Sequence, residues 1–111
     1  MSTGVLDRGT TRAVEASPAT VAAADLVVSG PGPGDPRDAD SARIARLREI
    51  VAERVDAGAP LLAVCLSHQV LADRLGLELA PLASPHQGLQ RTVDVFGTPA
   101  SIGFYNTFTA R

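Results

Sequence analysis

The sequence predicts an α/β fold in which short parallel strands alternate with helices. Two short apolar segments, residues 25–29 and 61–64, each lead into a turn and then into a segment of helical character. Parallel strands connected in this way bring both turns to the carboxyl edge of the sheet, where open α/β sheets bind ligands. We therefore expect a functional site where the two turns meet.

The first turn, residues 30–34, alternates glycine with proline. Proline has no backbone N–H, and no Gly-Lys-Ser/Thr follows, so the turn is not a phosphate-binding P-loop. Acidic residues and Ser41 precede a helix that we expect to run to Ala57 and to stop at Gly58. Apolar residues recur on it at helical spacing and should face the sheet; they are Ile44, Leu47, Val51 and Val55. The Arg and Glu residues between them are interpreted as a solvated face.

The second turn contains Cys65, the single cysteine of the chain. A thiol at a strand-to-helix turn lies beside the positive end of a helix, which stabilises the nucleophilic thiolate. The alternative is a small buried hydrophobic residue, the usual role of a lone cysteine. One cysteine excludes an internal disulfide and favours a reducing, cytoplasmic location.

The remaining segments are less regular. The helix after Cys65 should run from Leu66 to Leu75 and end at Gly76, and short strands are predicted at residues 77–79, 89–95 and 101–105. Residues 1–20 show no sustained period. We therefore interpret 1–20 as an irregular N-terminal lead-in and 21–111 as the domain.

Composition excludes several classes of function. The chain has 111 residues, enough for one small domain, and a net charge of −2, which gives no electrostatic basis for nucleic-acid binding. No apolar run reaches the roughly 20 residues of a membrane span. One cysteine and two distant histidines do not make a zinc site.

Three segments, taken in order, resemble the class I (triad-type) glutamine amidotransferases. They are residues 32–36 (Gly-Pro-Gly-Asp-Pro), residues 64–69 (Val-Cys-Leu-Ser-His-Gln) and residues 102–108 (Ile-Gly-Phe-Tyr-Asn-Thr-Phe). The resemblance covers residues 25–111. Details at residues 67–69, 85–90 and 103–108 are most similar to the amidotransferase part of anthranilate-synthase-like enzymes of phenazine biosynthesis, which make aminodeoxyisochorismate from chorismate and glutamine.

The resemblance implies a flavodoxin-like, three-layer fold with a mainly parallel sheet, here incomplete at both ends. It also implies that Cys65 attacks the glutamine amide and forms a thioester. The N–H of Leu66 and the loop at Gly32 and Gly34 would stabilise the oxyanion. Substrate contacts are implied for the following residues: Pro33, Gln69, Thr107 and Phe108.

Two features depart from the family pattern. Ala63 and Ser67 stand where the crowded elbow usually has glycine, and no His-x-Glu supplies the general base of the triad. His68 is interpreted as a helix-packing residue, and His86 as an exposed or loosely packed loop residue.

We therefore interpret the chain as a fragment of an amidotransferase domain. Two functions remain possible. It is the glutaminase part of an anthranilate or aminodeoxyisochorismate synthase, or a catalytically incomplete remnant or docking module. The resemblance implies glutamine as substrate and a chorismate-binding synthase domain or subunit as partner. No cofactor is expected in this chain, and Mg²⁺ only in that partner. Exposed apolar sheet edges predict aggregation or a homo-oligomer.

Overall fold

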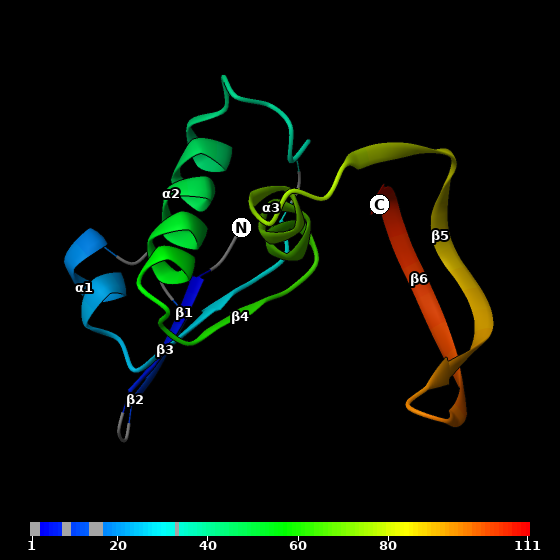
Figure 1. Cartoon of the computed structure of the whole chain (residues 1–111), viewed down its shortest axis with the longest axis horizontal. Helices are drawn as coiled ribbons and strands as arrows, with labels where there is room; N and C mark the ends of the chain where they lie inside the picture. Colours follow the sequence, from blue (N-terminus) through cyan, green and yellow to red (C-terminus); the bar gives the residue numbers. More distant parts are fainter. Residues whose placement is uncertain (1–2, 8–9, 14–16, 33) are drawn as a thin grey trace.

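A computed structural model describes residues 3–7, 10–13, 17–32 and 34–111. In chain order the elements are β1 (Thr3–Asp7), β2 (Thr10–Ala13), α1 (Pro18–Ala23), β3 (Leu26–Ser29), α2 (Ala42–Asp56), β4 (Leu61–Ala63), α3 (Leu66–Arg74), β5 (Leu79–Val95) and β6 (Thr98–Ala110). Figure 1 shows two parts, a sheet with its helices and a long hairpin of β5 and β6 beside α3. The predicted α/β class is confirmed.

The first sheet is mixed rather than mainly parallel. Its strand order is β2-β1-β3-β4, in which β3 and β4 run parallel while β1 is antiparallel to both β2 and β3. The prediction that residues 1–20 are irregular was therefore wrong for β1 and β2. Strand formation here depends on the exposed backbone edge of β3, a tertiary context that overrides weak local patterning.

All three helices pack on one face of this sheet, as Figure 1 shows for α1 and α2. Val27 and Ser29 of β3 are fully buried on that face, and Leu61 of β4 packs against both core clusters. On the opposite face, Leu62 is 54% exposed and Val64 40%. The described residues thus form two layers, not the three that the resemblance implies, and the fully buried residues of β3 are on one face.

Helix α2 begins and ends where the sequence predicts. The Ser41 hydroxyl accepts the Ile44 N–H at 3.4 Å, and Gly58 has a positive φ of 62° just beyond the last turn. The core between α2 and α3 contains Ile44, Leu47, Val51, Leu66 and Val70, with Val55 partly buried beside it. Ile50 extends the buried face to Val21 of α1 and Val27 of β3.

Arg54 corrects the interpretation of the charged face of α2. It is only 2% exposed. Its guanidinium donates to the carbonyl oxygens of Val21 (3.2 Å), Ala24 (3.1 Å) and Pro60 (2.7 Å). Arg54 therefore ties the end of α1 and the start of β4 to α2 through three backbone carbonyls, of which those of Val21 and Pro60 also accept a backbone N–H.

In place of the short strands predicted after α3, the structure has two long strands, β5 and β6. β5 and β6 are joined through Phe96 and Gly97, whose φ values of 52° and 86° suit a two-residue hairpin turn. The pairing has two register shifts, one between Pro81 and His86, which contains Pro85, and one between Gln87 and Leu89, which contains Gly88. The unpaired residues at these shifts form β-bulges within the hairpin.

Within the described ranges, no helix is both long and apolar enough to cross a membrane.

Replacing Arg54 with Met should lower the free energy of unfolding by about 2 kcal/mol, because the carbonyls of Val21, Ala24 and Pro60 lose the hydrogen bonds that the guanidinium donates. Urea unfolding followed by circular dichroism measures the change. Glu53→Gln, an exposed neighbour on the same helix, is the control and should lie within about 0.5 kcal/mol of the parent. Equal stability of both variants would contradict a structural role for Arg54.

Candidate active site

Cys65 occupies a sharp turn between β4 and α3. Its backbone has φ 55° and ψ −112°, a left-handed conformation that is uncommon for a residue with a Cβ. The thiol is exposed rather than buried. The predicted strand-to-helix elbow is therefore present, and the alternative of a buried small hydrophobic residue is not what the structure shows. The first N–H groups of α3 point out of its N-terminus at this turn.

Ser67, which replaces the usual glycine of the elbow, is fully buried. Its hydroxyl donates to the Gly30 carbonyl at 2.8 Å and lies 2.7 Å from the Ser29 hydroxyl, which then donates to it. The Val64 N–H also donates to the Ser29 carbonyl at 2.9 Å. The serine thus fills the space with hydrogen bonds that join the cysteine elbow to the start of the glycine-proline loop.

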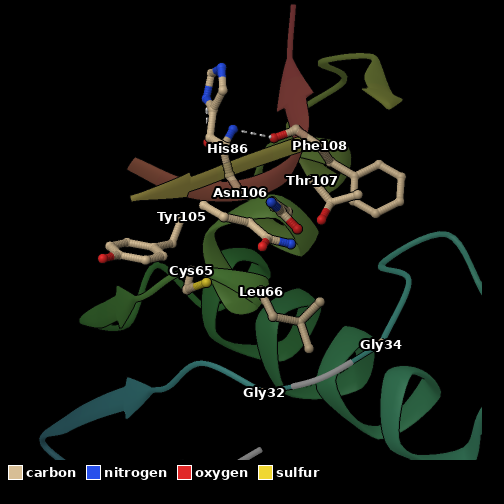
Figure 2. Close-up of a pocket in the computed structure, with 11 residues that line it drawn as sticks. Gly32, Gly34, Cys65, Leu66, His86, Tyr105, Asn106, Thr107 and Phe108 are labelled. Carbon is tan, nitrogen blue, oxygen red and sulfur yellow. Dashed lines mark hydrogen bonds between the residues drawn. The ribbon is translucent and has the colours of Figure 1, made fainter. Parts of the chain in front are cut away.

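The glycine-proline loop lies beside the elbow because β3 and β4 are parallel neighbours. Gly34 has φ 130°, which a residue with a side chain rarely adopts, and a Cβ there would lie 3.5 Å from Ile44 Cδ1. Pro33, predicted to contact substrate, lies outside the described residues. Figure 2 shows Gly32 and Gly34 on one side of Cys65 and the hairpin on the other.

A cavity of about 310 Å³ opens between the loop, the elbow and the hairpin. Seven of the eight predicted site residues line it: Gly32, Gly34, Cys65, Leu66, Gln69, Thr107 and Phe108. No site role was predicted for the other lining residues, which are His86, Gln87, Tyr105 and Asn106. The structure therefore brings the three predicted segments to one site.

A second cavity, of about 500 Å³, shares Cys65 and Gln69 with the first and extends between α3 and β6. His68 lines this second cavity and is exposed. The interpretation of His68 as a helix-packing residue was therefore wrong. On α3 it lies on the side turned toward the hairpin rather than toward α2.

His86 is neither loose nor in a loop. It lies on β5, where its Nδ1 is 2.9 Å from Asn106 Oδ1 and its ring meets Phe104 edge-on at 6.1 Å. Figure 2 shows its imidazole pointing away from Cys65. Pairing His86 with Asn106 across two strands would have required recognising residues 84–88 as strand, which their proline and glycine obscured.

Arg37 connects the glycine-proline loop to the hairpin. Its guanidinium makes a two-point ion pair with Asp35, at 3.0 and 2.9 Å, and lies 4.8 Å from the centre of the Phe108 ring. Hydrogen bonding from Arg37 lowers the pKa of Asp35 below 3.8. The cation–π contact joins the segment after the loop to β6.

The described part of the chain contains no group of three or more His, Cys, Asp or Glu side chains placed to hold a metal ion.

The chain matches a family model and several known proteins. The family model of glutamine amidotransferase class-I matches residues 6–111. The chain belongs to this family. It is 51% identical over 87 residues to an anthranilate synthase, phenazine specific, of Pseudomonas fluorescens, and 48% identical to one of Pseudomonas chlororaphis; each match covers 78% of this chain. A carbamoyl phosphate synthase small chain of Clostridium perfringens is 38% identical over 69 residues, 62% of this chain.

The chain spans only 14% of the length of each of the two Pseudomonas relatives, and 18% of the Clostridium protein. Residues 32–36, 64–69 and 102–108 predicted this family, and the family is confirmed. The predicted similarity to the enzymes of phenazine biosynthesis is confirmed by the two Pseudomonas relatives.

Ser67→Ala should destabilise the fold by about 1–2 kcal/mol, because the buried Gly30 carbonyl and Ser29 hydroxyl lose a partner. Ser29→Ala should lower the free energy of unfolding less in the Ser67→Ala variant than in the parent protein, since the two hydroxyls act as a pair. A double-mutant cycle in urea measures the coupling. Strictly additive losses would contradict the proposed link between elbow and loop.

Arg37→Gln should raise the pKa of Asp35 toward 3.8, because the charged donor that stabilises the carboxylate is lost. With Arg37 present, the stabilisation is complete at neutral pH and disappears as pH falls through the lowered pKa. An NMR titration of the Asp35 carboxyl carbon measures this shift. An unchanged titration midpoint would show that the ion pair does not form in solution.

Proposed function

We propose that this chain is the glutamine-hydrolysing part of an anthranilate or aminodeoxyisochorismate synthase-like enzyme acting on chorismate, and that it works through a thioester on Cys65. The observation that carries the proposal is the strained backbone of Cys65 at φ 55°, which presents an exposed thiol to the cavity. Strain at a turn between strand and helix is typical of a nucleophile.

In this proposal the Cys65 thiolate attacks the side-chain amide carbon of glutamine and a C–S bond forms. The C–N bond then breaks, and the nitrogen takes up a proton and leaves as ammonia. Water hydrolyses the thioester to glutamate and regenerates the thiol. Both steps pass through an oxyanion, for which the Leu66 N–H and the Gly32–Gly34 side of the cavity are the proposed donors.

The amino-acid end of glutamine is proposed to lie against Gln69 and the backbone at Thr107 and Phe108. All three residues line the cavity, and Figure 2 shows Thr107 and Phe108 on its hairpin side. A cavity of about 310 Å³ is at the small end of ordinary ligand sites and suits a single amino acid.

The proposal also needs a general base that accepts the proton of the Cys65 thiol. The sequence has no His-x-Glu, and the imidazole of His86 points away from Cys65. We propose that a base from outside the described residues, on another segment or subunit, completes the site. The alternative function, a non-catalytic remnant or docking module, is favoured by the same observation.

The partner is proposed to be a chorismate-binding synthase domain or subunit, which receives the ammonia and holds any Mg²⁺. Support comes from the names of the two Pseudomonas relatives and from the short share of their length that this chain covers. A flavodoxin-like fold for the whole domain and a cytoplasmic location belong to the same proposal, the latter resting on the single cysteine.

A chloromethyl-ketone analogue of glutamine tests the proposal because it needs a thiolate but no proton relay. We expect mass spectrometry to show one adduct on Cys65, formed more slowly as glutamine is added. Iodoacetamide, which carries no amino-acid end, measures general thiol reactivity as the control. Labelling at the same rate as by iodoacetamide, with no protection by glutamine, would favour the non-catalytic alternative.

Release of ammonia from glutamine, with and without chorismate and a synthase partner, then separates the two functions. An active glutaminase part loses all release in Cys65→Ser, while a docking module releases none in either form.

A further inference from the structure

The pairing of β5 with β6 is interrupted beside the cavity. The register passes from Pro81 opposite Phe108 directly to His86 opposite Asn106, so residues 82–85 bulge out of the ladder opposite Thr107. Pro81 has no N–H to offer the backbone of Phe108. At the segment proposed to contact the amino-acid end of glutamine, the backbone is therefore held by something other than regular strand pairing.

Side chains replace the missing ladder bonds. Asn106 Nδ2 donates to the Phe108 carbonyl at 2.9 Å, as the dashed line in Figure 2 shows. The amide oxygen of Asn106 then faces His86 Nδ1 at 2.9 Å and accepts from it. With its donor and acceptor both engaged, the Asn106 amide has one orientation, held by the Phe108 carbonyl at its nitrogen and by His86 at its oxygen.

Packing fixes His86 in turn. Its ring lies edge-on to Phe104 at 6.1 Å, with an interplanar angle of 68°. The second register shift, between Gln87 and Leu89, follows at once. Bulges beside active sites commonly serve to aim backbone or side chains. Here two irregularities flank two ordered pairs, His86 with Asn106 and Gln87 with Tyr105.

We propose that His86 is a positioning residue for glutamine: through Asn106 it holds the Phe108 carbonyl, and with it the Thr107 backbone, in the conformation that receives the amino-acid end of the substrate. This proposal rests on the proposed function. It assigns His86 no proton transfer to or from Cys65, from which its imidazole points away.

The test measures glutamine binding separately from thiol reactivity. Iodoacetamide alkylation of Cys65 in the full chain is followed by mass, and the glutamine concentration that halves the rate gives an apparent dissociation constant. His86→Ala should raise this constant roughly three- to tenfold, the effect of losing one part-buried hydrogen bond. Asn106→Ala should do the same, and the double variant should add little because both remove one chain of bonds.

His86→Asn is the rescue variant, because its amide nitrogen can donate to Asn106 from nearly the position of the imidazole Nδ1. It should bind glutamine within about twofold of the parent. Thr92→Ala, an exposed substitution farther along β5, is the matched control for altering the hairpin surface.

Each outcome decides between the hypotheses. If glutamine does not protect the parent chain, the proposed function and this inference both fail. If glutamine protects the parent and His86→Ala equally, only the inference fails. If His86→Ala and Asn106→Ala both lose cooperative thermal unfolding, or if His86→Asn binds as weakly as His86→Ala, the pair serves the fold and positioning is overturned.

Discussion

The parallel pairing of β3 with β4 is the constraint on which the site depends. Because the two strands run in the same direction, the glycine-proline loop that follows β3 and the cysteine elbow that follows β4 leave the sheet at one edge. Ser67 then joins the two turns through its buried hydrogen bonds to Gly30 and Ser29. A glycine there would leave the turns adjacent but unlinked by side chains.

The strain at Cys65 is sustained by this arrangement. A left-handed conformation at a residue with a Cβ persists only where the surroundings over-determine it. The chain before Cys65 is held by the Val64 N–H on Ser29, and the chain after it by the buried Leu66 and Ser67 of α3. The cost of the strained turn is thus offset by burial and hydrogen bonds on both sides, and the thiol remains at the surface of the cavity.

Local sequence predicted the parts of the fold that depend on local patterns. The bounds of α2, the elbow at Cys65 and the meeting of the loop with residues 107–108 all follow from periodicity, caps and the resemblance. Strands β1 and β2, the burial of Arg54 and the place of His86 did not. Each depends on a partner distant in sequence: the edge of β3, the carbonyls of Val21 and Ala24, and Asn106 across the hairpin.

The hairpin is held to the rest of the molecule by a small set of contacts. An isolated two-stranded ribbon is marginally stable, so these contacts decide where its backbone lies. Arg37 binds Phe108 from the loop side, while Asn106 holds the carbonyl of the same residue from within the hairpin. Phe108 is therefore fixed at its ring by one segment and at its backbone by another. The proposed glutamine contacts lie at residues 107–108. Under the proposed function, glutamine binding therefore depends on how these two segments meet, and Arg37 couples the segment after the glycine-proline loop to that part of the hairpin.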